Sequence, residues 1–257
     1  MKKKIHFKAM YLMLTLLACI PQMQYAKSTK PKSTPGTAIF VMAQTDQTLI
    51  IKDKTFTVQM DGLRLDMHIP QFFNLYDSDF QKQLNRTLLK EAHQRKKEII
   101  QTAKSYNKDL IQDGLTPIPF EYIETFSIIP SSYPNYTVEL YKYQYSGGAH
   151  GLSELSYINI NQETNQIVKL EDLFKEQVDY ISIINEFVHQ EIERRRLNGE
   201  FFFTGSDGFQ TISMNQPFFI NKNGDLVIVF NVYEIAPYAS GAIYITIPAD
   251  KISPYFK

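Results

Sequence analysis

The stretch of this sequence that is best suited to binding chemistry is an alternating tyrosine run that ends in glycines and a histidine, Tyr141-Lys-Tyr-Gln-Tyr-Ser-Gly-Gly-Ala-His-Gly151. Side chains two apart on a strand point the same way, so the three tyrosines share one face. Gly147 and Gly148 permit positive φ or the close approach of another segment. His150 can contact a ligand on this glycine-shaped surface or hydrogen-bond the backbone of a tight turn, and the absence of a partner acid or nucleophile favours the second role.

A second candidate stretch is Val232-Tyr-Glu-Ile-Ala-Pro-Tyr-Ala-Ser-Gly241, which follows an apolar run and contains a proline. It predicts an irregular loop, and loops held by a rigid scaffold are where binding residues concentrate. Tyr233 and Tyr238 would supply rigid amphipathic contact area, and Glu234 could meet a basic partner. An ordinary loop with packed tyrosines is an equally good interpretation.

Patterns for catalysis or metal binding are weak. The sequence has no His-Glu-x-x-His motif, no cysteine pair and no acidic calcium loop. His189 and Glu193 lie four residues apart, a spacing that is more typical of a solvated helical pair. Ser206 is not placed in a Gly-x-Ser-x-Gly elbow, and His68 alternates onto the solvent face of a predicted strand. We therefore expect no catalytic residue, no metal and no cofactor.

Composition narrows the class of protein further. The 257 residues contain 27 Lys and Arg against 27 Asp and Glu, so no chain-wide field indicates a nucleic acid partner. Hydrophobic residues make up 44% of the chain, which is ordinary for a globular protein. The one cysteine, Cys19, leaves the folded part without a disulfide.

The amino terminus predicts export. Lys2-Lys-Lys4 precedes an apolar run, residues 9–18, that is too short to span a bilayer. Leu16-Leu-Ala-Cys19 matches a lipoprotein box, in which Cys19 is lipidated, and cleavage after Ala26 is the alternative. We expect a signal peptide at 1–26, a tether at 27–37, and an extracytoplasmic location in the periplasm or at the cell surface. Membrane contact would come only through a lipid on Cys19.

Apolar periodicity predicts the elements that carry these stretches. Two amphipathic helices are expected, one from Ser78, capped by its own hydroxyl with Gln81 completing a capping box, to about Asp113, and one from Asp172 to Asn198. Pro70 is expected to end the strand that contains it. The predicted strands are 39–42, 48–51, 55–60, 63–69, 121–129, 136–145, 154–161, 166–170, 210–214, 216–221, 225–231 and 242–248.

Short hairpin connections between most of these strands favour an α+β fold with antiparallel-rich sheets and two long amphipathic helices. Each half of the chain would contain hairpin strands and one helix. We expect an N-terminal α+β half at 38–150 and a C-terminal α+β half at 151–257, with a structural relationship between the halves left open.

Several short motifs, taken in their order along the chain, resemble those of a known pair of bacterial domains. They are Ser146-Gly-Gly-Ala-His150 after its tyrosines, Asn159-Ile-Asn161, Leu170-Glu-Asp-Leu-Phe174 and Tyr233-Glu-Ile-Ala-Pro-Tyr-Ala-Ser-Gly241. The chain from Thr55 to its carboxyl end resembles the outer part of RsiV-type anti-sigma factors and the N-terminal region of PdaC-type peptidoglycan deacetylases. The resemblance implies an α+β fold and, in the anti-sigma members, an outer domain that binds lysozyme, which triggers their proteolysis.

The chain also differs from both of these protein types. It shows no sigma-binding segment or membrane-spanning helix, as the anti-sigma factors have, and no deacetylase domain. We therefore expect a non-catalytic cell-envelope module that binds or senses a lysozyme-like protein or a cell-wall ligand such as a peptidoglycan fragment. The expected contacts are Gly147, Gly148, His150, Tyr233, Glu234 and Tyr238. Two alternatives stay open: a peptidoglycan hydrolase or deacetylase, and a purely structural envelope lipoprotein.

Overall fold

The computed structural model describes residues 38–39, 49–132, 135–161, 163–164 and 166–257. The predicted signal peptide, the tether and Cys19 lie outside these residues. Pro35–Lys257 form one compact unit, and every element below belongs to it. Within the part of the chain that is described, no helix has both the length and the apolar character that a bilayer crossing requires.

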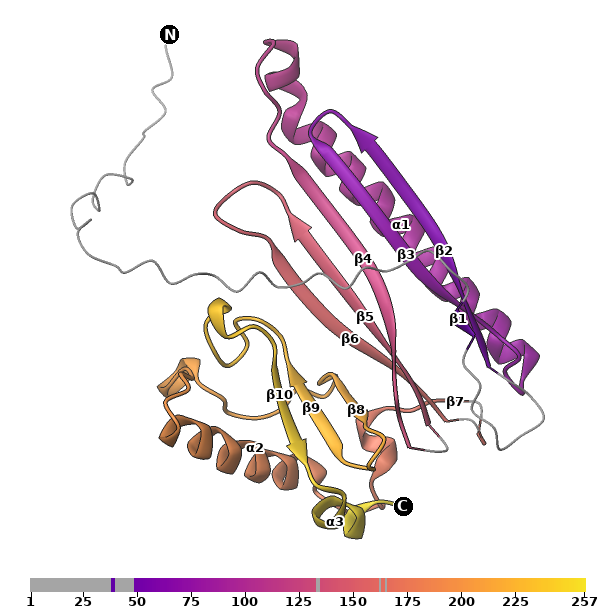
Figure 1. The fold of residues 1–257 in the computed structure, drawn as a ribbon, viewed down its shortest axis with the longest axis vertical. Helices are drawn as coiled ribbons and strands as arrows, with labels where there is room; N and C mark the ends of the chain where they lie inside the picture. The colour runs from indigo at the N-terminus through magenta and orange to yellow at the C-terminus, as the bar shows by residue number, and fades with distance from the viewer. Residues whose placement is uncertain (1–37, 40–48, 133–134, 162, 165) are drawn as a thin grey trace. The chain divides into compact units, whose positions relative to one another are not determined.

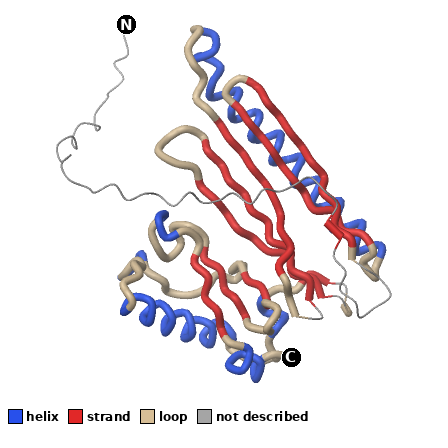
Figure 2. Tube along the Cα trace, in the orientation of Figure 1, coloured by secondary structure: helices blue, strands red, loops and turns tan. Residues whose placement is uncertain are grey.

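The larger of two sheets has seven strands that lie side by side in chain order (Figure 1). Neighbouring strands are antiparallel except for β3 and β4, which run parallel because the long helix α1, Ser78–Gln112, connects them. Figure 2 shows this single helix against one face of the sheet. The strands are β1 Ala38–Ile39, β2 Ile50–Met60, β3 Leu63–Phe73, β4 Phe120–Ile129, β5 Asn135–Tyr145, β6 Leu152–Asn161 and β7 Gln166–Ile167.

The N-cap of helix α1 lies one residue before the predicted cap. The carboxylate of Asp77 accepts hydrogen bonds from the backbone N–H groups of Asp79 and Phe80, so Asp77 is the N-cap and Ser78 is already helical. Gln81 accepts from the backbone N–H of Leu75. The apolar stripe of the helix packs on the sheet and forms the first core with it, through Leu84, Leu88, Ala92 and Ala103.

The prediction that Pro70 ends its strand is wrong. β3 continues to Phe73 and pairs with β2 throughout. On its other side β3 pairs with β4 only over Leu63–Met67. At Pro70 the strand therefore has a neighbour on one side only, which is a position where a proline is tolerated in a sheet.

The second sheet has three antiparallel strands in the order β10-β9-β8. Its strands are β8 Phe218–Ile220, β9 Leu226–Phe230 and β10 Ile243–Ile247, and its helices are α2 Tyr180–Leu197 and the short α3 Ala249–Ile252. Together with the segment from Leu170 they form the second core. The fold is α+β, as the sequence predicted.

One helix and one strand predicted in this part turn out differently. Helix α2 begins only at Tyr180, because Asp179 caps it through Ser182, while Phe174 instead forms a β-bridge with Phe256. The predicted strand at 210–214 is not formed, since the backbone N–H of Ile212 donates to the side chain of Asn185 on α2.

The hairpin β5–β6 connects the first core to the second sheet. Ile158 and Ile160 of β6 belong to the first core. Leu155 alternates onto the other face and packs with Val227 and Val229 of β9. We call this small cluster of Leu155, Val227 and Val229 the seam. The large sheet thus continues past the boundary that was expected between residues 150 and 151, because β6 pairs with β5 along its whole length.

Candidate functional site

The turn between β5 and β6 is shaped by its glycines. Gly147 and Gly148 have φ of 84° and 115°, a region that L side chains rarely adopt. A Cβ on Gly147 would also lie 2.7 Å from Cγ2 of Ile118. The hydroxyl of Tyr145 donates to the carbonyl oxygen of Gly148 at 3.0 Å and closes the turn.

His150 is held in one tautomer by this turn. Its Nδ1 lies 3.0 Å from the carbonyl oxygen of Gly151, which can only accept, so Nδ1 carries the proton. Nε2 is then an acceptor, and the hydroxyl of Tyr233 donates to it at 3.1 Å. The hydrogen bond from Nδ1 is of the kind that the scaffold role of His150 requires, and the ring also meets the other candidate loop. Its contact with a ligand stays a prediction.

Two rings of that loop complete the arrangement. The ring of His150 stacks on Tyr238 with centroids 4.1 Å apart and planes 19° apart. The ring of Tyr233 lies 5.7 Å from Tyr238 and 6.1 Å from His150. We call His150, Tyr233 and Tyr238 the aromatic cluster. The structure thus brings together two stretches that the sequence identified separately.

Tyr233 occupies an unusual position in the cluster. Its backbone has φ of 67°, which is uncommon for a residue other than glycine and costs free energy. Its side chain is 48% exposed, although an aromatic residue of this size would be stabilised by burial. A strained backbone that presents an exposed ring is typical of a binding loop.

The tyrosine face of β5 lies beside the cluster. Partial burial is the largest cause that raises the pKa of Tyr141 and of Tyr143, and the neighbouring Tyr238 hydroxyl raises both further. Both hydroxyls are therefore neutral donors at neutral pH. Gly151 permits this packing, since a Cβ there would lie 2.5 Å from the ring of Tyr143.

Glu234 does not join the aromatic cluster. One carboxylate oxygen accepts from Nε2 of Gln216 at 3.0 Å, and the other accepts from the backbone N–H of Asn231 at 2.7 Å. The structure gives Glu234 a part in fixing the loop, and its contact with a basic partner stays a prediction.

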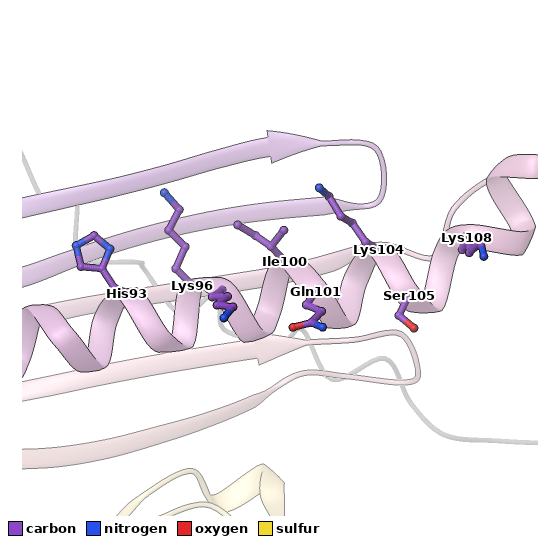
Figure 3. Close-up of a pocket in the computed structure, with 8 residues that line it drawn as sticks. His93, Lys96, Ile100, Gln101, Lys104, Ser105 and Lys108 are labelled. Carbon is purple, nitrogen blue, oxygen red and sulfur yellow. The ribbon is translucent and has the colours of Figure 1, made fainter.

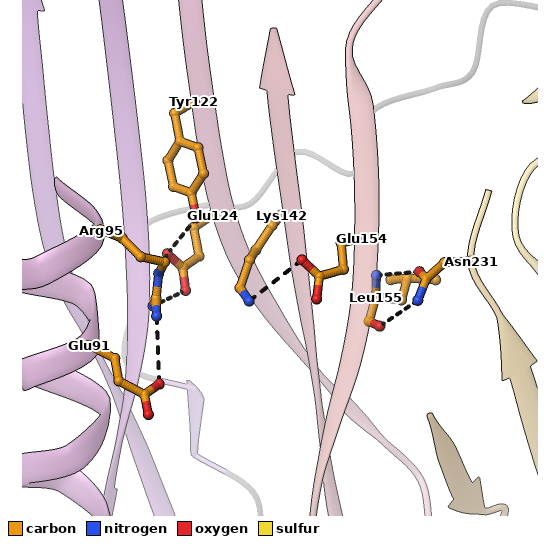
Figure 4. Close-up of polar contacts among 8 residues, drawn as sticks. All are labelled: Glu91, Arg95, Tyr122, Glu124, Lys142, Glu154, Leu155 and Asn231. Carbon is orange, nitrogen blue, oxygen red and sulfur yellow. Dashed lines mark hydrogen bonds and ion pairs between the residues drawn. The ribbon is translucent and has the colours of Figure 1, made fainter. Parts of the chain in front are cut away.

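Asn231 belongs to the site, although no sequence motif pointed to it. Its side chain bonds the backbone of Leu155 on β6 and so fastens the loop to the large sheet (Figure 4). The one available signal was an asparagine directly after the apolar strand β9, where a polar side chain can bond a neighbouring backbone.

A cavity of about 550 Å³ opens beside the cluster. It is lined by residues of α1, β4, β5, β6 and the loop after β9, with Val232 and Tyr233 from that loop. Its charged groups are Arg95 and Glu98 from the helix and Lys142 and Glu154 from the hairpin, and the last two lie 3.8 Å apart (Figure 4). The volume lies in the range of small-molecule sites.

Arg95, which lines this cavity, forms an ion pair with the buried carboxylate of Glu124. The guanidinium of Arg95 donates to both carboxylate oxygens of Glu124, at 2.6 and 3.1 Å, and Glu124 is only 3% exposed. The hydroxyl of Tyr122 donates to the same carboxylate at 3.2 Å. Every oxygen of Glu124 is engaged, so this network holds α1 on the sheet and offers no free acid.

The remaining histidine candidates do not form a site. His189 meets the edge of Phe209, and Glu193 accepts from Arg196 instead. His68 was expected on the surface, yet its side chain is 16% exposed and lies between Asp53 and Asp66. Among the residues that the structure describes, no three His, Cys, Asp or Glu side chains are grouped closely enough to hold a metal ion.

Comparisons with known proteins match the two parts of the chain separately. Residues 57–153 match the family described as deacetylase PdaC, and residues 171–250 match the family described as a protein of unknown function, DUF3298. The anti-sigma-V factor RsiV of Bacillus subtilis (strain 168) is 27% identical over 212 residues, which cover 79% of this chain and 70% of that protein.

Solved structures share the fold. A crystal structure of a DUF3298 family member from Bacteroides fragilis has a TM-score of 0.63 at 18% identity and covers 82% of this chain and 94% of that one. Another from Pseudomonas aeruginosa PAO1 has a TM-score of 0.55 at 14% identity, covering 83% and 95%.

Proposed function

Because the chain is an RsiV/PdaC-type domain of unknown function, as its motifs predicted, we propose that it is a non-catalytic binding or sensing module of the cell envelope. Its relatives support an extracytoplasmic module, and export with lipid attachment at Cys19 or cleavage after Ala26 belongs to the proposal. The folded unit would follow the signal peptide at 1–26 and the tether at 27–37.

The aromatic cluster carries this proposal. It is assembled from two loops on different sheets, and each loop is fixed by hydrogen bonds of its own. Rigid, partly exposed tyrosines give contact area at low entropic cost, which is why they dominate binding surfaces. His150 has Tyr233 and a carbonyl as partners rather than an acid or a nucleophile, and this supports recognition rather than catalysis.

The partner that fits best is a basic protein, and a lysozyme is the candidate that the family resemblance suggests. Outside α1, residues 38–257 contain 23 Asp and Glu against 12 Lys and Arg. An acidic surface accelerates association with a cationic protein and favours it over acidic competitors.

A second candidate ligand is a peptidoglycan fragment in the cavity beside Tyr233. The match of residues 57–153 to a deacetylase family supports a link to the cell wall. A peptidoglycan-modifying enzyme is the corresponding alternative, and a purely structural lipoprotein would use neither surface.

Titration calorimetry with lysozyme tests the proposal on residues 27–257, which contain the whole compact unit. We expect saturable one-to-one binding that Tyr238→Ala weakens by about tenfold or more. Tyr76→Ala is the matched control, since Tyr76 is 84% exposed and lies just before α1, far along the chain from both loops.

Three results would contradict the proposal in different ways. The absence of heat at any workable concentration removes lysozyme and leaves peptidoglycan fragments as the next titrant. Equal weakening by Tyr238→Ala and Tyr76→Ala removes the aromatic cluster as the site. Turnover of a peptidoglycan fragment that is lost in His150→Ala would establish the enzyme alternative.

A further inference from the structure

A surface of α1 that is not part of the aromatic cluster has a chemistry of its own. A shallow groove of about 790 Å³ runs along the helix and is lined by α1 residues alone (Figure 3). We call it the lysine groove. Its cationic residues are Lys96, Lys97, Lys104 and Lys108, with His93 at one end, and its lining contains no Asp or Glu.

The positive charges of the groove are uncompensated. Lys97, Lys104 and Lys108 form no ion pair with any residue in the described ranges. Elsewhere on the helix, Lys82 pairs with Asp79 at 3.0 Å and Arg95 is held by Glu124. The ammonium of Lys96 lies 5.5 Å from the centre of the Phe56 ring, a cation–π contact that keeps its charge.

Helix α1 is also the positive part of an otherwise acidic segment, residues 38–257. α1 contains eight Lys and Arg against four Asp and Glu, whereas the rest of residues 38–257 has the excess of 23 acidic over 12 basic residues. Anions are therefore attracted to α1 and repelled by the remaining surface. The excess of positive charge on α1 therefore directs an anionic partner to this helix.

We propose that the lysine groove binds a flexible linear polyphosphate chain that lies along α1. At a rise of ~1.5 Å per residue, Lys97 and Lys104 are separated by roughly 10 Å along the axis, and Lys104 and Lys108 by roughly 6 Å. An extended chain with a phosphate on each repeating unit can meet these charges in turn. Lysine ammonium groups act as point charges and tolerate variable phosphate geometry.

The groove suits a chain better than a membrane surface. Helices that bind bilayers insert bulky apolar side chains between their cations. Here the one large apolar lining residue, Ile100, is half-buried against the first core. A hollow between long lysine side chains admits a single polymer strand, while a flat bilayer would touch only the lysine tips.

The test uses residues 27–257 and fluorescently labelled inorganic polyphosphate, with anisotropy measured at about 50 mM and about 200 mM salt. The groove variant is Lys97→Gln/Lys104→Gln/Lys108→Gln. The matched control is Lys222→Gln/Lys251→Gln/Lys257→Gln, which removes the same charge from exposed sites in the other part of the fold. All six lysines are exposed, so both variants are expected to fold, and circular dichroism checks this.

We expect binding that salt weakens, about tenfold or greater loss in the groove variant, and a salt slope reduced by about two units there. The affinity of the control variant should change by less than about twofold, because the charges that it loses do not contact the polymer. Lysozyme titration of the groove variant keeps the two proposals separate, because the aromatic cluster is unchanged in it.

Two results would overturn the proposal. Equal weakening in both variants would mean that only net charge matters. Binding to vesicles of anionic phospholipid without binding to polyphosphate would assign the groove to a membrane surface instead.

Discussion

The side-chain amide of Asn231 bonds both backbone groups of Leu155, accepting from the N–H at 2.7 Å and donating to the carbonyl oxygen at 3.2 Å. Leu155 lies on β6, which begins directly after Gly151, and Asn231 begins the loop that carries Tyr233 and Tyr238. One amide therefore holds the two loops of the aromatic cluster in register, although Asn231 is not part of the cluster.

Asn231→Ala should destabilise the protein and weaken its ligand binding together. The substitution leaves the N–H and carbonyl of the buried Leu155 without these partners, which costs about 1–3 kcal/mol in unfolding free energy. Urea denaturation measures this loss. Asn198→Ala, at an exposed asparagine that ends α2, is the control and should change stability by less than about 0.5 kcal/mol. Equal losses in the two variants would contradict the assigned role.

Gly151→Ala should displace the tyrosine face. A Cβ at this position would lie 2.5 Å from the ring of Tyr143, so the ring must move, at a cost of about 1–3 kcal/mol. The double variant Gly151→Ala/Tyr143→Ala removes the clash, and its loss of stability should be smaller than the sum of the single losses. Additive losses in thermal or urea unfolding would show that the ring is not the obstacle.

Arg95→Leu should be the most damaging single change on α1. It leaves the carboxylate of Glu124, which is 3% exposed, buried without its cation, and losses in such cases are about 3–5 kcal/mol. Arg95→Leu/Glu124→Leu should recover much of this loss, because no unpaired charge remains. Arg86→Leu, at an exposed position of the same helix, is the control in urea unfolding. Failure of the double variant to recover stability would show that the pair contributes more than charge compensation.

Acidic pH should remove the contribution that Glu191 on α2 makes to the stability of the folded protein. Hydrogen bonds from Arg194, and then from Arg195, hold its pKa at about 2, below the ordinary value of 4.5. Because the folded-state pKa is the lower one, its stabilisation is present above pH 4.5 and is lost as the pH falls towards 2.

Glu191→Gln should therefore be less stable than the unmodified protein by about 1 kcal/mol near neutral pH, a figure reduced for partial exposure. This difference in unfolding free energy should disappear as the pH falls from 4.5 to 2. Urea midpoints across this range measure it. Glu176→Gln changes an exposed carboxylate before α2 and should show no such gap. A gap that stays constant with pH would mean that the loss comes from packing rather than from ionisation.

The sequence predicted most strands and the long helix because their periodicity is strong. β4 at 120–129 and β5 at 135–145 begin one residue before their predicted starts, and α1 ends where Asp113 and Gly114 interrupt it. Errors occurred where tertiary contacts decide the outcome. Pro70 stays in β3 because that part of the strand is paired on one side only, and Phe174 is drawn into a bridge with Phe256 instead of starting α2.

The site was predictable in its residues but not in its assembly. Tyrosine spacing and glycines pointed to His150, and the proline-bearing loop pointed to Tyr233 and Tyr238. No local pattern could show that these loops meet, since the contact depends on how β6 and β9 pack in the seam. For the same reason Glu234 looked free in the sequence, whereas Gln216 and Asn231 engage it.

The place of β6 has a consequence for how this protein can be divided and inherited. The two matched families cover residues 57–153 and 171–250, so nearly all of β6 lies between them. A fragment that stops at 153 would leave the first core without Ile158 and Ile160, and one that starts at 171 would leave Val227 and Val229 uncovered. Any unit that recombination or protein engineering transfers must therefore contain both matched regions together with β6.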